Sequence, residues 1–529
     1  MVKILVADKI ADEGLQILKD GGNFEVAYKP EITPDEMAGI IPEFDALVVR
    51  SRAKVPASVL EKAKNLKVVG RAGVGVDNVD VTAATRRGII VMNTPDGNTI
   101  SAAEHTMSML MDLSRNIARA DKTMKEGKWE KKVLTGVELY GKTLGVIGLG
   151  RIGKAVARRA LAFDMRVICF DPGVSPEEIQ KLGMVNATLE EIIKESDFIT
   201  VHTPLTEKTK GLIGEEQFKY MKKNCRIINC ARGGIIDEHA LLKAINEGRI
   251  AGAALDVFTA EPLPEDSPLR KCDKILLTPH LGASTVEAQE KVALQVAMQI
   301  VTYLKGGEVI NAVNAPSIDP ELLRAMRPYL DLAERLGKFA SSYADSRVVK
   351  INCWYSGGIL DYPLAPLTTA VVKGFLEPET DLSVNYINAM NLAKERGIEV
   401  IESKSTTSQQ YANLISVETE MENGERHKVS GTLYTTDMPR IVILNDRHFN
   451  AVPEGNMIVI KNRDVPGIIG AVATILGNHA INIAHMTWGR SKPLGDAMTI
   501  INTDQEITGD IIREIGKLKD VLSVKFFKV

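Results

Sequence analysis

The sequence predicts an α/β protein in which two Rossmann-like, doubly wound parallel sheets are followed by an α+β domain and a small ferredoxin-like domain. Two successive series of strand-length apolar runs alternate with helical patterns up to about residue 285, which is typical of βαβ units around a parallel sheet. A G-x-G-x-x-G triplet stands near the start of the second series. From about Asn456 the chain follows the order β-α-β-β-α-β, which is typical of a ferredoxin-like unit.

The first series runs from residue 1 to about residue 94. Its strand-like runs are KILVAD, ALVVRS, KVVGRAG and IIVMNT, and helical segments such as IADEGLQILKD lie between them. The second series starts at KTLGVIGLG and continues through RVICFD, SDFITVHTP, RIINCARGG, AGAALDVF and KILLTPH. Each series therefore predicts one α/β unit.

The sequence after residue 285 indicates that the chain returns to the first unit. A long amphipathic helix is expected over residues 286–306, and the stretch GGEVINAVNAPSIDPELL is a predicted linker because Gly, Asn and Pro cluster there. Residues 316–452 mix a helical opening with strands such as KVSGTLYT and hold no catalytic motif. The expected domains are a substrate-binding domain (1–98 plus 286–315), a dinucleotide-binding domain (99–285), an intervening domain (316–452) and a C-terminal domain (453–529).

The composition argues against several classes of protein. At 529 residues the chain is too long for one core. Lys and Arg number 65 against 68 Asp and Glu, with no long block of one sign, so no nucleic-acid or membrane partner is expected. The longest basic cluster, residues 125–132, is interrupted by glutamates and is interpreted as a solvated helix face.

The cysteines and histidines give no sign of a metal site. The five cysteines are scattered, odd in number and without C-x-x-C pairing, which argues against a disulfide framework or zinc. Seven of the histidines show no metal-ligand spacing and are predicted to be structural or solvated. They are His105, His202, His239, His427, His448, His479 and His485. With neither a signal peptide nor an apolar stretch of the roughly 18 residues that a membrane span needs, we expect a cytoplasmic protein.

The glycine triplet Gly148, Gly150 and Gly153 follows an apolar strand and opens a helical segment. In that context the glycines allow a tight turn and close approach of the backbone to a pyrophosphate, whose negative charge the helix N-terminus favours. Asp171 ends the next strand, 18 residues after Gly153, where a carboxylate binds ribose hydroxyls and repels a 2′-phosphate. The pattern predicts NAD rather than NADP, and the alternative is a plain strand-to-helix turn.

Polar side chains follow the ends of the later strands. They are His202, Thr203, Cys230, Arg232, Asp256, Glu261 and His280. We expect them to face one cleft, because the carboxyl ends of parallel strands meet at one edge of a sheet. Oxidation of a hydroxy acid needs a base, a cation for the carboxylate and a hydride acceptor, which His280, Arg232 and NAD would supply. From spacing alone, a structural loop histidine and a surface Arg–Glu ion pair remain open as alternatives.

Six motifs in one order resemble those of the D-isomer-specific 2-hydroxyacid dehydrogenases. They are GRAGVGVDNVD, NTPDGNTISAAEHT, GKTLGVIGLGRIG, NCARGGIIDE, AALDVFTAEP and LTPHLGAST, within about residues 1–315. The resemblance implies that Arg232, Glu261 and His280 form the catalytic trio and that His280 moves the proton. It is strongest to the branch that oxidises D-3-phosphoglycerate to 3-phosphohydroxypyruvate with NAD, the first step of the phosphorylated route to L-serine.

The same resemblance implies the ligand contacts. Beside the glycine triplet, NAD would be contacted by Arg151, Ile152, Asp171, Thr203, Cys230, Ala231, Asp256, Gly282 and Ala283. The substrate's phosphate and carboxylate would be met by Arg50, Arg71, Gly73, Val74, Gly75 and Asn98. Arg50 bears on substrate identity, because a phosphorylated substrate needs a cation in addition to Arg232; an ordinary strand-end arginine is the alternative. Val74 stands where related enzymes often carry a hydroxyl residue near the cofactor.

The C-terminal segment NRDVPGIIGAVATILGNHAINIAHM resembles the ACT regulatory domain. Its serine-binding positions fall on Asp464 and Asn482, and Asn462 stands where some relatives have tyrosine. The middle region, including VNYINAMNLAKERGIEV, resembles an extra domain of long family members that is implicated in anion- or substrate-linked control. Because ACT modules pair between subunits, the resemblance implies a homo-oligomer, a tetramer or a dimer, with L-serine as an allosteric effector. An ACT unit that serves only assembly is the alternative.

Two other functions stay open at this point. One is a dehydrogenase or reductase for an unphosphorylated acid such as glycerate or glyoxylate, which would tolerate the loss of Arg50. The other is a non-catalytic NAD-sensing scaffold, as in co-repressors that share this fold and keep the catalytic trio. The ACT-like tail favours a metabolic enzyme.

Overall fold

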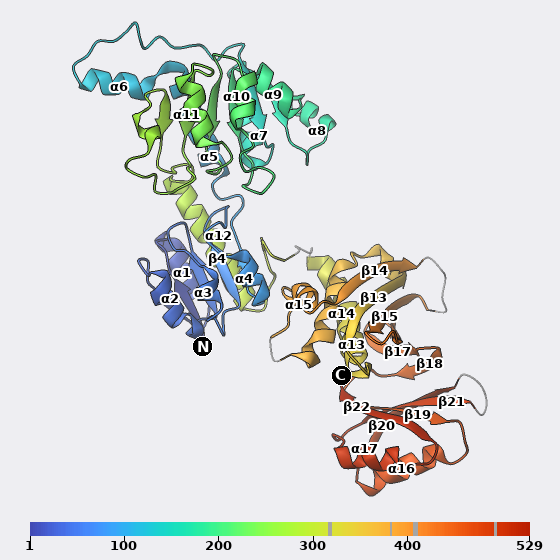
Figure 1. The fold of residues 1–529 in the computed structure, drawn as a ribbon. Coiled ribbons are helices and arrows are strands. Elements are labelled where there is room, and N and C mark those ends of the chain that lie inside the picture. Colours follow the sequence, from blue (N-terminus) through green and yellow to red (C-terminus); the bar gives the residue numbers. More distant parts are fainter. Residues whose placement is uncertain (316–319, 381–382, 406–410, 491–494) are drawn as a thin grey trace.

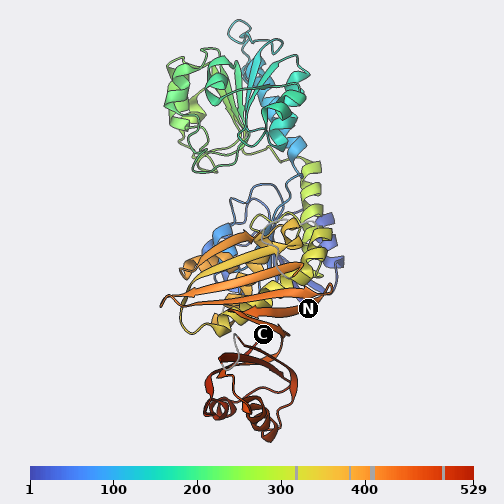
Figure 2. The same cartoon turned by 90° about the vertical axis from the view of Figure 1, so that its right-hand side faces the viewer.

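The computed structural model describes residues 1–315, 320–380, 383–405, 411–490 and 495–529. Two parallel sheets are followed by a mixed sheet and an antiparallel sheet, so the predicted fold class is confirmed. In Figures 1 and 2 the unit built on the second sheet lies at one end of the molecule and the unit built on the fourth sheet at the other. The predicted boundary at residues 315 and 316 falls next to 316–319, which lie outside the described residues.

The first sheet has five parallel strands in the order β2-β1-β3-β4-β5. The strands are β1 (Val2–Val6), β2 (Phe24–Tyr28), β3 (Ala46–Val49), β4 (Val68–Arg71) and β5 (Ile90–Met92). The apolar residues of β3, β4 and β5, and those of β1 apart from Val2, are buried on both faces, as expected for a parallel sheet covered by helices, whereas those of the edge strand β2 are partly buried or exposed. One face packs against α1 (Asp12–Asp20) and α12 (Val286–Leu304). The other packs against α2 (Pro34–Ile40), α3 (Ala57–Leu60) and α4 (Val81–Arg86).

The second sheet has seven parallel strands in the order β12-β11-β10-β9-β6-β7-β8. The strands are β6 (Thr143–Ile147), β7 (Arg166–Phe170), β8 (Val185–Asn186), β9 (Phe198–Val201), β10 (Arg226–Asn229), β11 (Gly252–Leu255) and β12 (Ile275–Leu277). Its helices are α5 (Thr99–Arg115), α6 (Ile117–Lys125), α7 (Arg151–Leu161), α8 (Pro176–Lys181), α9 (Leu189–Glu195), α10 (Glu215–Tyr220) and α11 (Glu238–Asn246). The strand order reverses between β6 and β9, and ligands of doubly wound sheets bind at such a switch point.

The chain crosses twice between these two units. Helix α5 begins the second unit, and α12 returns to the first unit, where the sequence predicts a long helix (Figure 1). The hydroxyls of Ser101 and Thr285 lie 2.7 Å apart and join the two crossings. Residues 125–132 are largely solvent-exposed, but all except the first follow the end of α6, so the predicted helix face is wrong there.

The predicted linker is wrong for its first part. Ala312 forms an antiparallel bridge with Met92 of the first sheet. The side chain of Asn314 accepts a hydrogen bond from the backbone of Val91 at 2.9 Å and donates one to the carbonyl of Ile89 at 2.9 Å. The chain is therefore bound to the edge strand β5 as far as Asn314.

The third sheet is mixed, in the order β14-β13-β15-β16-β17-β18. Its strands are β13 (Val348–Gly357), β14 (Glu399–Ser405), β15 (Asn413–Met421), β16 (Arg426–Tyr434), β17 (Met438–Leu444) and β18 (Arg447–Ala451). Its helices are α13 (Pro320–Tyr343), α14 (Ala365–Leu376) and α15 (Ala389–Glu395). This unit lies against the first one (Figure 1), where Arg86 pairs with Glu395 at 2.8 Å and Asn385 donates to the carbonyl of Gly88 at 2.8 Å.

The fourth sheet has the antiparallel order β20-β21-β19-β22. Its elements follow the predicted β-α-β-β-α-β order. They are β19 (Asn456–Arg463), α16 (Ile468–Asn478), β20 (Ile483–Arg490), β21 (Asp496–Thr503), α17 (Gly509–Gly516) and β22 (Val521–Lys528). Among the helices of the described ranges, none has both the length and the apolar character needed to cross a bilayer.

Candidate active site

The loops after β10 and β11 pack directly on one another. A Cβ at Gly233 would lie 2.0 Å from the carbonyl oxygen of Phe258, so only glycine permits this approach. Glu238 accepts hydrogen bonds from the backbone and the hydroxyl of Thr259 at 2.6 and 2.8 Å. This packing places the loop of Arg232 beside the loop that carries Glu261.

His280 and Glu261 form the hydrogen-bonded pair that the sequence predicts. Nδ1 of His280 lies 2.7 Å from Oε2 of Glu261, and the backbone N–H of Phe258 donates to Oε1 at 3.0 Å. Burial opposes ionisation of Glu261, but these hydrogen bonds outweigh it and lower the pKa of its carboxyl group. An ionised Glu261 accepts the proton of Nδ1, which leaves Nε2 as the proton-transfer atom. The His280 side chain is 48% exposed and accessible to a ligand.

The backbone around His280 is held by hydrogen bonds to Asp256. His280 has a φ of 55°, and its N–H donates to the carbonyl of Asp256 at 2.9 Å. The carboxylate of Asp256 accepts from the backbone of Leu281 at 2.7 Å and of Gly282 at 2.9 Å. Asp256 was expected to contact NAD, but its side chain is fully buried and bound to the His280 loop, so that contact stays a prediction.

Arg232 reaches across to the first unit. Its Nε lies 2.8 Å from Oδ2 of Asp77, and its Nη1 donates to the carbonyl of Ala231 at 2.7 Å. A Cβ at Gly75 would lie 1.7 Å from Nη2 of Arg232. The predicted carboxylate-binding cation and the predicted glycine loop therefore meet across the gap between the two units.

Arg50 and Arg71 add positive charge at the same place. Nε of Arg71 donates to the carbonyl of Arg50 at 3.0 Å. Burial, followed by the positive charge of Arg232, lowers the pKa of Arg71 to about 10, and Asp77 partly opposes this effect. A Cβ at Gly73 would lie 1.7 Å from Nη1 of Arg71. Three arginines thus gather where the sequence predicts the phosphate and the carboxylate of the substrate.

Asp8 holds the backbone beside this arginine cluster, and this role was not predicted from the sequence. It is 3% exposed, and its carboxylate accepts from the backbone of Arg50 at 2.7 Å and of Ala53 at 3.0 Å. Burial lowers the pKa of Arg50, and the charge of Asp8 acts in the opposite direction. An acid at the end of the first apolar run, KILVAD, was the available signal.

The remaining predicted substrate residues lie in the loops after β4 and β5. The carbonyl of Val74 accepts from the side chain of Asn93 at 2.5 Å. Asn98 precedes α5, and within the described ranges its Oδ1 is buried without a hydrogen-bond partner, as is Oγ1 of Thr99. Buried polar atoms without a partner are costly, so these two atoms fit a polar ligand.

The glycine loop after β6 fits a dinucleotide. A Cβ at Gly153 would lie 2.1 Å from the carbonyl oxygen of Gly148, whereas a Cβ at Gly150 would meet no atom within 4 Å. The close approach of Gly153 to Gly148 makes the tight turn possible. The open space at Gly150 lets a pyrophosphate approach the backbone. Asp171 accepts from the backbone of Leu149 at 2.6 Å beside this loop. Oγ1 of Thr203 is buried with no partner among the described residues.

Other predicted cofactor residues have partners in the protein. Arg151 pairs with Asp96 of the first unit at 2.6 Å. Sγ of Cys230 lies 3.3 Å from Sδ of Met109, and burial raises the pKa of the thiol to about 12. Ile152, Ala231 and Ala283 are partly buried. Contacts of these residues with NAD stay predictions.

The two predicted serine-binding residues are not brought together within one chain. Asp464 follows β19, where its side chain pairs with Arg490 at 3.0 Å. Asn482 precedes β20 and donates to Asp504 at 2.6 Å. Strands β19 and β20 both pair antiparallel with β21 and so run in the same direction, which puts these two residues at opposite ends of the sheet.

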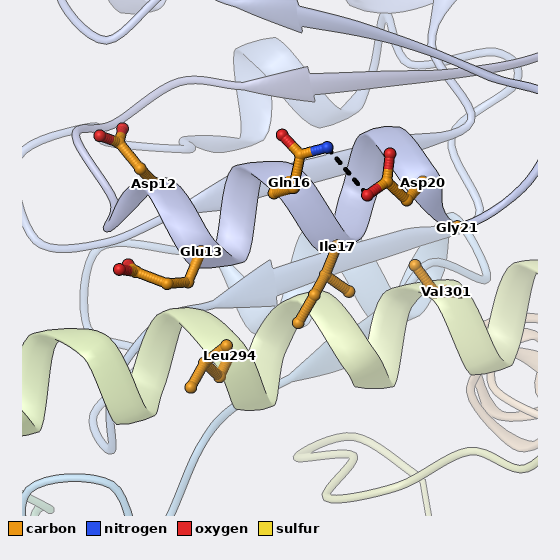
Figure 3. A pocket seen from close by; sticks show the side chains of 8 residues that line it. All are labelled: Asp12, Glu13, Gln16, Ile17, Asp20, Gly21, Leu294 and Val301. Atoms are coloured by element: carbon orange, nitrogen blue, oxygen red, sulfur yellow. Dashed lines mark hydrogen bonds between the residues drawn. The ribbon is translucent and has the colours of Figure 1, made fainter.

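A groove of about 680 Å³ lies elsewhere, between α1 and α12 (Figure 3). Ile17, Leu294 and Val301 contribute its apolar lining, and Asp12, Glu13 and Asp20 are acidic. This acidic lining disfavours an anionic ligand, so the strand ends remain the candidate active site.

Three family models match the chain in order. They are the D-isomer specific 2-hydroxyacid dehydrogenase NAD binding domain over residues 107–282, the D-3-phosphoglycerate dehydrogenase intervening domain over 325–445, and the ACT domain over 456–520. Arg232, Glu261 and His280 lie in the first of these ranges.

Relatives match along the whole chain. The D-3-phosphoglycerate dehydrogenase of Archaeoglobus fulgidus is 42% identical over 100% of both chains, and that of Methanocaldococcus jannaschii is 44% identical over 98% of this chain and 99% of the relative. Among solved structures, the TT0316 protein from Thermus thermophilus has a TM-score of 0.55 at 34% identity and covers 59% of this chain and 100% of that chain.

The NAD-dependent formate dehydrogenase from Staphylococcus aureus, solved in complex with NAD, has a TM-score of 0.55 at 28% identity over 60% of this chain and 100% of that chain. Together these matches confirm the predicted resemblance, the enzyme class and the cofactor NAD. The chain belongs to the D-3-phosphoglycerate dehydrogenase family, within the D-isomer specific 2-hydroxyacid dehydrogenases.

Proposed function

We propose that this chain catalyses the NAD-dependent oxidation of D-3-phosphoglycerate to 3-phosphohydroxypyruvate, the first step of the phosphorylated route to L-serine. The observation that carries the proposal is the cluster of Arg50, Arg71 and Arg232 at the gap between the first two units. A substrate with both a phosphate and a carboxylate needs cations for each, and arginine binds both groups through paired hydrogen bonds. The names of the full-length relatives support the same substrate.

The contacts described above support the proposed catalytic roles. Nε2 of His280 takes the proton of the substrate hydroxyl, and Glu261 stabilises the resulting imidazolium through Nδ1. Arg232 holds the carboxylate, and Arg50 and Arg71 hold the phosphate. NAD, when bound, accepts the hydride. In the reverse direction His280 returns the proton to the carbonyl oxygen of the keto acid.

The predicted division into domains and the predicted ligand contacts belong to the same proposal. The loops of residues 71–75 and Asn98 would hold substrate, and the glycine triplet, Asp171 and Thr203 would hold NAD. The enzyme would act in the cytoplasm as a homo-oligomer. Because Asp464 and Asn482 lie at opposite ends of one sheet, an L-serine site that uses both needs two copies of the ACT domain side by side.

The test is oxidation of NADH by the purified protein with 3-phosphohydroxypyruvate, hydroxypyruvate and glyoxylate, each with and without L-serine. Preference for the phosphorylated keto acid is expected, and suppression by serine would support the regulatory role of the ACT domain. Equal or better turnover of glyoxylate would contradict the phosphorylated substrate. No turnover of any keto acid would contradict the enzyme and favour an NAD-sensing scaffold.

A further inference from the structure

We infer that His105, on helix α5, is a positioning residue that holds the catalytic loop of residues 278–282. The inference rests on the proposed function insofar as His280 is the acid–base group of that loop. By its sequence context His105 is predicted only to be structural or solvated. The contacts around Asp256 carry the argument.

Asp256 is the anchor of the catalytic loop, and His105 lies against its carboxylate and hydrogen-bonds to Thr278 of the loop. Nε2 of His105 lies 3.1 Å from Oδ1 of Asp256 and 3.2 Å from Oγ1 of Thr278. The Thr278 hydroxyl itself donates to Oδ1 of Asp256 at 2.6 Å. The backbone N–H groups of Leu281 and Gly282 complete the set of donors on the same carboxylate.

This carboxylate is ionised and fully buried. Burial opposes ionisation of Asp256, but the hydrogen bonds from His105, Thr278 and the backbone of Leu281 outweigh it and lower its pKa. A buried carboxylate that loses one donor is less well solvated and shifts toward its remaining donors. Two of those donors are the amides that follow His280, so we expect a shift of the carboxylate to displace the loop.

Helix α5 presents a stripe of side chains to this segment. Ser101, His105 and Met109 are spaced four residues apart and therefore lie on one face of the helix. Ser101 contacts Thr285 at 2.7 Å, His105 contacts Asp256 and Thr278, and Sδ of Met109 lies 3.8 Å from Oγ1 of Thr278. His105 is the ring N–H donor in the middle of this stripe.

The position of the loop matters for proton transfer. His280 has a left-handed backbone conformation, which a non-glycine residue keeps only when its surroundings hold it there. A misplacement of about 1 Å in a reacting group costs up to about 100-fold in rate. Loss of the His105 donor should therefore lower turnover without weakening the arginine contacts that bind the keto acid.

The test compares His105→Leu, which removes the donor, with His105→Gln, whose side-chain amide replaces it. His239→Leu is the matched control, because His239 is an exposed histidine of the same unit and makes no described contact with the loop. Two readouts are needed: kcat and KM with 3-phosphohydroxypyruvate, and amide hydrogen exchange of the peptide that contains Leu281 and Gly282.

For His105→Leu we expect a fall in kcat of about 10- to 100-fold, a KM within about twofold of wild type, and faster exchange at Leu281 and Gly282. His105→Gln should restore most of kcat and of the protection, and His239→Leu should match wild type. Wild-type kcat and protection in His105→Leu would overturn the inference, as would equal losses in the Leu and Gln variants. An inactive wild type would overturn the proposed function alone, because the exchange readout decides the inference without turnover.

Discussion

Nε of Arg232, in the second unit, lies 2.8 Å from Oδ2 of Asp77, in the first. The cation proposed to hold the substrate carboxylate thus already has a carboxylate partner, which competes with the substrate for the same guanidinium. This pair is partly exposed, where such ion pairs contribute about 1 kcal/mol or less.

The first prediction concerns this competition. Asp77→Asn should lower KM for the keto acid by up to about fivefold, in line with an exposed ion pair, and leave kcat unchanged. Steady-state kinetics at low and high salt measure it, since added salt should shrink the difference. Asp96→Asn, which frees Arg151 instead, is the control and should not change KM for the keto acid. A higher KM in Asp77→Asn would mean that Asp77 orients Arg232 rather than competing for it.

The second prediction concerns the proton-transfer pair. His280→Ala should lower kcat by about 10²- to 10⁴-fold, because the general acid and base is lost. Glu261→Gln should cost less, since it keeps an oxygen that accepts the Nδ1–H but loses the negative charge. Fluorescence titration should show unchanged NADH binding in both variants. Near-wild-type turnover in His280→Ala would remove that residue from the mechanism.

The third prediction concerns recognition of the phosphate. Arg50→Ala should raise KM for 3-phosphohydroxypyruvate by about 10- to 100-fold, the usual effect of losing a hydrogen bond to a charged group. KM for hydroxypyruvate should barely change, so the ratio of kcat/KM for the two keto acids is the measurement. An unchanged ratio would contradict a phosphate contact at Arg50.

The fourth prediction separates two glycines of the cofactor loop. Gly153→Ala should destabilise the protein even without NAD, because the new Cβ would lie 2.1 Å from a backbone carbonyl. Gly150→Ala should keep the Tm of the free protein, since no atom lies within 4 Å of its Cβ position, and weaken only NAD binding. Thermal melts with and without NAD distinguish the two. Equal melting temperatures of both free variants would contradict this account of the turn.

The fifth prediction concerns acid stability. His202 is partly buried and shares a hydrogen bond with Thr200 at 3.0 Å. Loss of solvent around the ring lowers its pKa from 6.5 to about 4. Between these values the unfolded chain binds a proton that the folded chain does not, so the free energy of unfolding falls as pH falls through this window. From pH 6.5 to 5 the loss is about 1.6 kcal/mol, because the unfolded histidine is already half protonated at pH 6.5.

The matched variant is His202→Gln, which keeps a polar side chain but cannot titrate. Its Tm should drop less than that of wild type between pH 7 and pH 5, measured by calorimetry under identical buffer conditions. An equal drop would assign the acid sensitivity to other groups.

The fold followed from local patterns, but parts of the site did not. Periodicity and glycine spacing predicted both parallel sheets, the returning helix α12 and the ferredoxin-like unit. Asp8, at the end of the run KILVAD, and His105 have partners 42 or more residues away in the chain, so the local pattern did not show what either side chain binds. The linker was misjudged for a related reason: Asn314 is a turn-forming residue by type, and only the folded first unit brings the partners of its side chain, on and beside β5 and α4, within reach.

The two chain crossings at Ser101 and Thr285 have a mechanical consequence. Because the two connections between the units lie side by side, the relative motion that strains them least is a rotation about the line through both. Twisting or sliding of one unit against the other would strain one connection. Such a rotation would change the distances from Asp77 and Gly75 to Arg232. The angle between the units would therefore set how strongly Asp77 competes with the substrate carboxylate for the Arg232 guanidinium.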